Sequence, residues 1–160
     1  LGAKSIVGTD RSAKSLEIAR KRFQSERVRF VAIQDCQPTG GIDLAFCNGV
    51  FHHIPPARRA EAVDYVLRSL RPGGIFAFWE NNPWNPGTRY VMNRIPFDRD
   101  AVRLSAPQAK RLLRNGRFEI LRTDFLFIFP KLLDWFRWIE PHCSSLPVGA
   151  QYQVLCRKPR

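Results

Sequence analysis

The stretch that decides the fold is IVGTDRSAKSLEIARKR, from Ile6 to Arg22. It begins as a short apolar strand that ends on an acid, Asp10, and a helix follows almost at once. Ser12 is the expected N-cap of that helix, and Leu16 and Ala19 recur at the spacing of one helical face. An acid at the end of a strand that leads into a helix is typical of open α/β sheets, where it binds ribose hydroxyls.

The rest of the chain alternates strand and helix patterns. Further strands are predicted at 28–33, 42–48, 75–80, 117–129 and 149–158. Further helices are predicted at 57–70, 105–116 and 130–141, the first of them stopped by the RPGG turn at 71–74. The stretch from 81 to 104 shows little periodicity and is longer than a simple connection requires. This order predicts an α/β fold with a mostly parallel sheet and a single domain over residues 1–160.

Length and composition agree with one globular domain. The chain has 160 residues, of which 44% are hydrophobic, and it contains neither an apolar run of the ~20 residues that a membrane span needs nor the layout of a signal peptide. We therefore expect a soluble, cytoplasmic protein. The four cysteines lack close pairs, so buried thiols are favoured and no metal site is expected.

Positive charge is the strongest global feature. The chain carries 26 Lys and Arg against 14 Asp and Glu, a formal net charge of +12. Such an excess attracts phosphates and other anions. The basic residues are nevertheless spread over 20–22, 58–59, 110–114 and 157–160, without the interleaved aromatics of a single-strand binding groove. A solvated basic surface is the favoured interpretation, and nucleic acid is a less favoured partner.

Four pieces of the sequence, taken in order, resemble the class I S-adenosyl-L-methionine (SAM)-dependent methyltransferases of type 11 or 25. These pieces are residues 6–20, the Asp35-Cys36 pair, residues 42–54, and the LRPGG turn at 70–74 that leads into the strand at 75–80. The last two predicted strands are similar to the C-terminal hairpin of that family. The resemblance implies a Rossmann-like sheet with helices on both faces and an antiparallel last strand.

The resemblance also implies that the first βα unit is missing. The family begins with a strand, a glycine-rich loop that holds the methionine moiety, and a helix, whereas this chain starts at the family's second strand. In the family the missing strand lies between the strands expected at 5–10 and 42–48. We therefore expect the sequence to be an N-terminally truncated fragment of a longer protein, with SAM as the cofactor.

The resemblance assigns the nucleoside of SAM to four residues. Asp10 would accept both ribose hydroxyls and Arg11 would lie over the adenine edge, while Asp35 and the backbone of Cys36 would bind adenine. Each residue has a plainer interpretation as well. Asp10 would cap the following helix, Arg11 would be an exposed side chain beside a turn, and Asp35 would open an Asx-turn.

Asn48, Gly49 and Val50 follow a buried strand and resemble the segment beneath the methionine moiety, where a glycine allows close backbone approach. The next two candidates, His52 and His53, would act as catalytic bases only if the acceptor must lose a proton. Packing histidines are the more common outcome at such positions.

Candidate acceptor-binding residues follow the strand predicted at 75–80. Glu80, Asn81, Asn82 and Trp84 stand where open α/β sheets bind substrates. The alternative is a loop held together by its own side chains. The segment from Pro96 to Asp100 would close over the same pocket as a lid, or Arg99 would pair with a neighbouring aspartate.

The predicted function is therefore SAM-dependent methyl transfer to a small or medium-sized acceptor. The first alternative is an RNA methyltransferase, which the net charge of +12 favours. The second is a Rossmann-like interaction domain without catalysis. The sequence names neither the acceptor nor the oligomeric state, and it gives no sign of a membrane partner.

Overall fold

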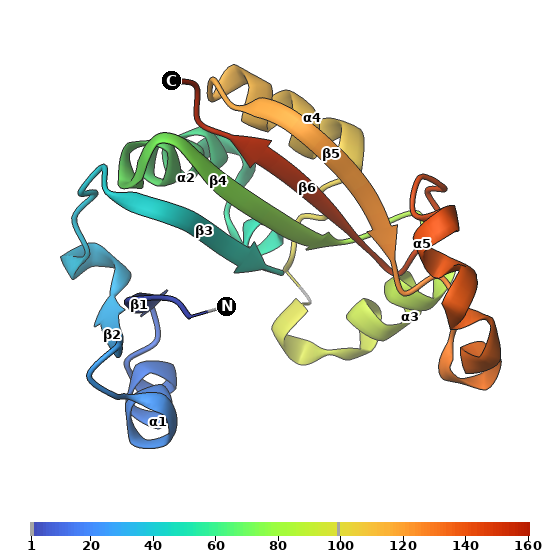
Figure 1. Cartoon of the computed structure of the whole chain (residues 1–160). Helices are drawn as coiled ribbons and strands as arrows, with labels where there is room; N and C mark the ends of the chain where they lie inside the picture. Colours follow the sequence, from blue (N-terminus) through green and yellow to red (C-terminus); the bar gives the residue numbers. More distant parts are fainter. Residues whose placement is uncertain (1, 99) are drawn as a thin grey trace. The chain divides into compact units, whose positions relative to one another are not determined.

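The computed structural model describes residues 2–98 and 100–160 (Figure 1), so the predicted role of Arg99 lies outside the described residues. The chain divides into two compact units, Leu1–Pro38 and Thr39–Arg160. The single domain expected from the sequence over residues 1–160 stays a prediction. Among the described helices, none is long and apolar enough to cross a membrane.

The first unit is a two-stranded parallel sheet with one helix. Strand β1 (Ile6–Asp10) pairs with β2 (Val28–Ala32), and Asp10 stands opposite Ala32 at the carboxyl edge. Helix α1 (Ala13–Phe23) begins as predicted, because the Ser12 hydroxyl accepts the Ser15 N–H at 3.2 Å. A short 3₁₀ turn, η1 (Ile33–Asp35), follows β2.

The second unit contains a four-stranded sheet in the order β3-β4-β6-β5. Its strands are β3 (Ile42–Asn48), β4 (Leu70–Asn81), β5 (Glu119–Leu126) and β6 (Gln151–Arg157). β3 and β4 are parallel, whereas β6 is antiparallel to both β4 and β5. The predicted antiparallel last strand is confirmed, and the sheet is mixed. β1 and β3, between which a missing strand was expected, pair with β2 and β4 respectively in separate sheets.

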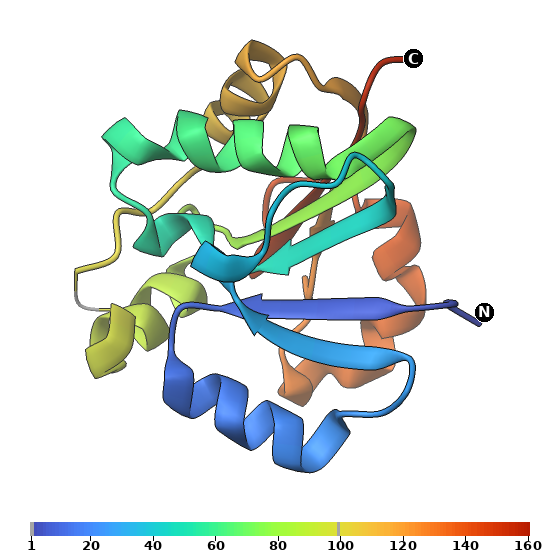
Figure 2. The ribbon, with the colours of Figure 1, turned by 90° about the vertical axis from the view of Figure 1, so that its left-hand side faces the viewer.

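Helices α2 (Arg59–Ser69) and α4 (Ala106–Asn115) cover one face of this sheet (Figures 1 and 2). The capping box of Ser105 and Gln108 starts α4 as predicted. The core between helices and sheet includes Val63, Leu113 and Phe78, each fully buried. Because full burial of such a side chain is worth about 1.5–3 kcal/mol, this layer holds β4 firmly and fixes the position of its carboxyl end.

Helix α2 ends at Ser69, just before the RPGG segment, as predicted, but this segment is not a separate turn. It lies within β4, where the pairing passes from Ile42–Leu70 directly to Leu44–Ile75, so residues 71–74 form an irregular insertion. A Cβ at Gly74 would lie 2.8 Å from the Arg71 carbonyl oxygen. The glycine is therefore required by a close approach of backbone within the strand.

The stretch 81–104, expected to lack regular structure, contains helix α3 (Pro86–Arg94) and the 3₁₀ turn η4 (Pro96–Asp98). The prediction of an irregular connection was wrong here. Asn85 caps α3, since its side-chain oxygen accepts the Thr88 N–H at 2.9 Å. An Asn followed by Pro is the N-terminal signal that the weak periodicity hid.

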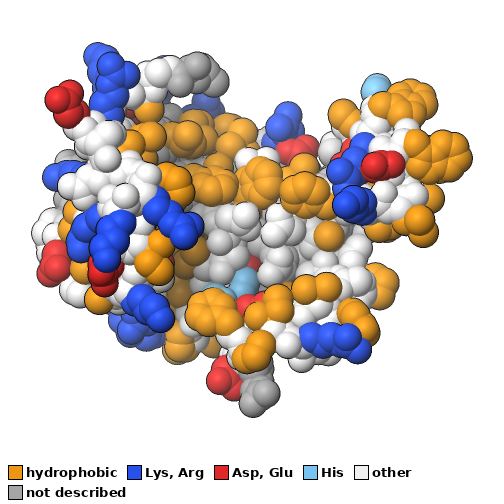
Figure 3. Space-filling view, turned by 90° about the horizontal axis from the view of Figure 1, so that it is seen from below, with side chains coloured by type: hydrophobic (Ala, Val, Ile, Leu, Met, Phe, Trp, Pro, Cys, Tyr) orange, Lys and Arg blue, Asp and Glu red, His pale blue; other side chains and the backbone are white. Residues whose placement is uncertain are grey.

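The predicted α-helix at 130–141 is also different in the structure. It consists of the 3₁₀ segment η5 (Lys131–Ile139), which is interrupted at Leu133 (φ −117°, ψ 30°), and the short helix α5 (Glu140–Cys143). The side chains of Leu132, Trp135 and Trp138 are largely exposed. Figure 3 shows hydrophobic side chains gathered on this part of the molecule, at the right of the view. β5 ends at Leu126, short of the predicted 129.

Candidate functional site

The carboxyl edge of the first unit carries two of the predicted nucleoside-binding acids. Asp10 ends β1, and its Oδ1 accepts the Ser12 N–H at 2.7 Å. Asp35 ends η1, the turn that directly follows β2. Both side chains are exposed, and because β1 and β2 are parallel, both acids lie at the same edge of the sheet.

Arg11 and Cys36, which follow these two acids in the sequence, do not both present a free group to a ligand. Arg11 is exposed. The Cys36 N–H donates to the Ile33 carbonyl at 3.3 Å, a long hydrogen bond. A ligand that uses this N–H must therefore replace that bond.

In the second unit, the predicted methionine-side residues follow β3. Asn48 ends the strand and Val50 is 45% exposed. Gly49 has φ +65°, and a Cβ on it would lie 3.4 Å from the His52 ring. The positive φ of the turn out of β3 therefore favours glycine, while a Cβ would make only ordinary contact with the next segment, η2 (Phe51–His53).

His52 and Glu80 form a buried pair. His52 is 3% and Glu80 1% exposed, and the His52 Nδ1–H donates to Glu80 Oε2 at 2.6 Å. Glu80 Oε1 also accepts the backbone N–H groups of Phe51 (2.7 Å) and His52 (3.3 Å). Burial would lower the pKa of His52, but the hydrogen bond and charge of Glu80, with the charge of Asp98, outweigh it and raise that pKa.

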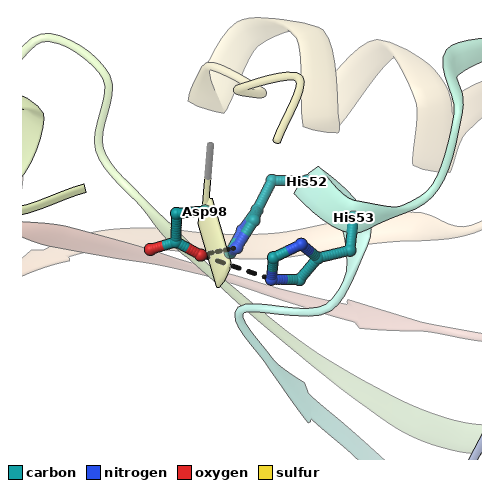
Figure 4. Close-up of side chains that lie close together, drawn as sticks. All are labelled: His52, His53 and Asp98. Atoms are coloured by element: carbon teal, nitrogen blue, oxygen red, sulfur yellow. Dashed lines mark ion pairs between the residues drawn. The ribbon is translucent and has the colours of Figure 1, made fainter. Parts of the chain in front are cut away.

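Asp98 joins the two histidines. Its Oδ1 lies 3.5 Å from His52 Nε2 and 3.4 Å from His53 Nε2 (Figure 4). The Asp98 side chain is 10% exposed and that of His53 28%. Burial and the neighbouring His52 lower the pKa of His53, against the opposing charges of Asp98 and Glu80. His53 also packs on the Phe97 ring at 4.4 Å between centroids.

Arg59 is a positioning residue that the sequence did not reveal, because a basic pair at 58–59 is typical of a solvated surface. Arg59 is only 6% exposed, and its guanidinium donates to the carbonyls of Phe51, Ile54 and Val102. The Val102 N–H in turn donates to the His52 carbonyl at 2.9 Å. Arg59 therefore ties the segment that carries the histidines to the segment that follows Asp98.

The predicted acceptor residues divide into two groups. The carboxylate of Glu80 already accepts hydrogen bonds from the ring and the backbone N–H of His52. Asn82 is fully buried, and its side-chain amide donates to the carbonyls of Pro147 and Gly149. Asn81 accepts from Gln151 at 3.2 Å, and Trp84 is 53% exposed. Trp84 is thus the exposed member of the set, while Glu80 and Asn82 hold the surrounding backbone.

This chain is similar in sequence to known methyltransferases. A family model described as a methyltransferase domain matches residues 1–76. Trans-aconitate 2-methyltransferase of Azoarcus sp. (strain BH72) is 29% identical over 91 residues, which cover 57% of this chain and 35% of that protein. The tRNA (carboxymethyluridine(34)-5-O)-methyltransferase ALKBH8 of Mus musculus is 30% identical over 126 residues, which cover 74% of this chain and 19% of that protein.

Solved structures show the same fold. A SAM-dependent methyltransferase from Mesorhizobium loti superposes with a TM-score of 0.71 at 17% identity, covering 98% of this chain and 81% of that one. The predicted Rossmann-like α/β class is thereby confirmed. The chain spans about a third of the length of the Azoarcus relative.

Proposed function

Because the chain belongs to the class I SAM-dependent methyltransferases, we propose that it transfers the methyl group of SAM to a small or medium-sized acceptor. The observation that carries the proposal is the pair of exposed carboxylates, Asp10 and Asp35, at one carboxyl edge of a parallel sheet. Open α/β sheets bind nucleotides at this edge.

The donor groups of a nucleoside fit these two acids. An ionised carboxylate only accepts hydrogen bonds, and ribose hydroxyls and the adenine amino group donate them. Asp10 already uses Oδ1 for the Ser12 N–H, so its second oxygen is the one that would accept from ribose. That fixed Oδ1 also orients the carboxylate before any ligand arrives. Asp35 would accept from the adenine amino group, with Arg11 and Cys36 beside the ring.

Bound SAM would supply an electrophilic methyl group on a positively charged sulfur. The chain's own task is then largely to position the acceptor in line with that bond. Asn48, Gly49 and Val50 would support the methionine side, and Trp84 with Asn81 would face the acceptor. Where the acceptor must lose a proton, His52 or His53 would accept it, with Glu80 orienting His52.

A small organic acid is the first acceptor to assay. The Azoarcus relative is named for trans-aconitate, and a chain with a formal charge of +12 attracts anions. The same charge and the relative named for tRNA favour RNA as the second candidate. The two candidates differ in salt dependence, because RNA affinity must fall steeply with salt whereas a small acid makes few ionic contacts.

Calorimetric titration of S-adenosylhomocysteine tests the cofactor part. We expect Asp10→Asn and Asp35→Asn each to weaken binding by about 10- to 100-fold, because a charge-assisted hydrogen bond is worth about 1.5–3 kcal/mol. Glu17→Gln is the matched control, since Glu17 is an exposed acid of the same unit that pairs with Lys21 on α1. Affinity at the wild-type level in both aspartate variants would leave only the interaction-domain alternative.

A further inference from the structure

Three potential metal ligands converge in the second unit, apart from the proposed nucleoside acids. One ring nitrogen of His52, one of His53 and a carboxylate oxygen of Asp98 all lie within 4.8 Å of one another. The histidines come from η2 and the aspartate from η4, so the cluster joins segments about 45 positions apart in the chain. Figure 4 shows the three side chains directed toward one another.

The orientation of His52 is the one that a metal ligand requires. Its Nδ1–H is bound to Glu80 Oε2 at 2.6 Å, which leaves Nε2 directed at Asp98. Metal-binding histidines usually donate their second ring N–H to a carboxylate or carbonyl in this way, which fixes the tautomer and makes the free nitrogen more basic. Glu80 is itself held by the N–H groups of Phe51 and His52.

The distances from Asp98 to the two histidines agree with a tetrahedral site. Asp98 Oδ1 lies 3.5 Å from His52 Nε2 and 3.4 Å from His53 Nε2. Zinc bonds of about 2.0–2.1 Å at tetrahedral angles place neighbouring ligand atoms roughly 3.3 Å apart. The same distances lie beyond the usual range of about 2.7–3.2 Å for N–H···O hydrogen bonds. Direct hydrogen bonds to Asp98 are therefore long at best, and a shared cation would fit the same spacing.

The backbone around the cluster is already fixed. Arg59 donates to the carbonyls of Phe51 and Ile54 on one side and of Val102 on the other. The Val102 N–H donates to the His52 carbonyl, and the Ala101 N–H to the Asp98 carbonyl. The two ligand-bearing segments are therefore held together independently of any ion, so little ordering is needed for binding.

From these contacts we propose that His52, His53 and Asp98 bind a divalent transition-metal ion. Two imidazole nitrogens and one carboxylate oxygen suit Zn²⁺ and neighbouring ions, whereas Mg²⁺ and Ca²⁺ prefer oxygen ligands alone. Three protein ligands leave a fourth position for water or an exogenous ligand. His53, the most exposed of the three, lies on the side from which the ion would enter.

Titration with ZnCl₂ and with CoCl₂ tests the site directly. We expect one Zn²⁺ per chain by calorimetry, unaffected by excess MgCl₂. We expect bound Co²⁺ to give the strong visible absorption of four-coordinate nitrogen and oxygen ligation, without the near-ultraviolet band of thiolate ligation. The latter distinction matters because the chain has four cysteines.

Variants then identify the ligands. His53→Ala and Asp98→Asn should each weaken Zn²⁺ binding by more than about 10-fold, and Glu80→Gln, which acts through His52, by about 10- to 100-fold. His142→Ala is the matched control, because His142 is an exposed histidine outside the cluster. Since His53 is partly exposed, its variant should keep the wild-type unfolding curve.

Retained Zn²⁺ affinity in the folded His53→Ala and Asp98→Asn variants would overturn the proposal. So would a Co²⁺ spectrum dominated by thiolate ligation, or loss of binding in His142→Ala alone. These outcomes are independent of methyl transfer, because the titrations contain neither SAM nor an acceptor.

Discussion

Replacing Glu80 by glutamine and by alanine separates two tasks of its carboxylate. Oε1 accepts the N–H groups of Phe51 and His52, and Oε2 accepts from the His52 ring. Glutamine keeps a carbonyl oxygen for the two backbone groups and removes the charge opposite His52. Alanine removes both oxygens and leaves three buried donors without a partner.

The two variants should differ clearly in stability. Glu80 is 1% and His52 3% exposed, so water cannot replace the lost contacts. Glu80→Gln removes one charge-assisted hydrogen bond, which is worth about 1.5–3 kcal/mol. Glu80→Ala also leaves two backbone donors unsatisfied: the Phe51 N–H costs about 1–3 kcal/mol and the long 3.3 Å contact of the His52 N–H contributes little, for a total of about 2.5–6 kcal/mol. A domain is stable by only about 5–15 kcal/mol, so the alanine variant should lose a large share of its stability.

Urea unfolding measured by tryptophan fluorescence is the assay, because all four tryptophans lie in the unit Thr39–Arg160. Glu119→Gln is the control on β5, which β6 separates from β4, and its exposed pair with Arg157 should contribute no more than about 1 kcal/mol. A Glu80→Gln variant as stable as the control would show that Glu80 does not hold the His52 ring. Equal losses in the two Glu80 variants would show that the backbone N–H groups need no acceptor there.

Three further predictions concern the core of the second unit. Tyr152→Phe should lower the free energy of unfolding by about 1–2 kcal/mol, because the fully buried hydroxyl donates to the Leu104 carbonyl at 2.8 Å; an unchanged urea midpoint would contradict this. Gly116→Ala should cost about 1–3 kcal/mol, since its Cβ would lie 2.3 Å from Val63 Cγ1, and adding Val63→Ala should make the Gly116→Ala step less costly in a double-mutant cycle. Burial is the main cause that raises the pKa of Cys47 and of Cys156 from 9.0 to about 12. At a pH of about 8 the thiolate fraction of each is therefore roughly 10³-fold lower than that of an exposed cysteine. In a thiol titration, both should react at the rate of an exposed cysteine only after the protein has been unfolded.

Local patterns in the sequence predicted the local structure well. The Ser12 cap and the Ser105 capping box begin their helices where expected, and the last strand is antiparallel as the family resemblance implied. These features depend on neighbours within a few residues or on one repeated pattern. Helix α3 was missed because its start depends on the single pair Asn85-Pro86, and periodicity could not support it.

The candidate site was predicted only in part, for a physical reason. His52 and Glu80 were both singled out, but for separate roles, because nothing local indicates that residues 28 positions apart share a proton. Arg59 has the charge and neighbours of a surface residue, and only its tertiary contacts reveal its burial. Asp98 was placed in a possible lid, and its approach to the histidines depends on α3 and η4, neither of which was predicted.

A histidine nitrogen that binds the metal ion cannot at the same time act as a catalytic base. A histidine accepts a proton through the lone pair that a metal ion would occupy, and Glu80 already takes the other ring nitrogen of His52. If both proposals hold, bound Zn²⁺ leaves His52 and His53 unable to accept a proton from the acceptor. Zn²⁺ should then inhibit transfer to an acceptor that must lose a proton, and chelation should restore it. An acceptor already ionised at neutral pH, such as a carboxylate, needs no base and should be methylated at a rate that chelation does not raise.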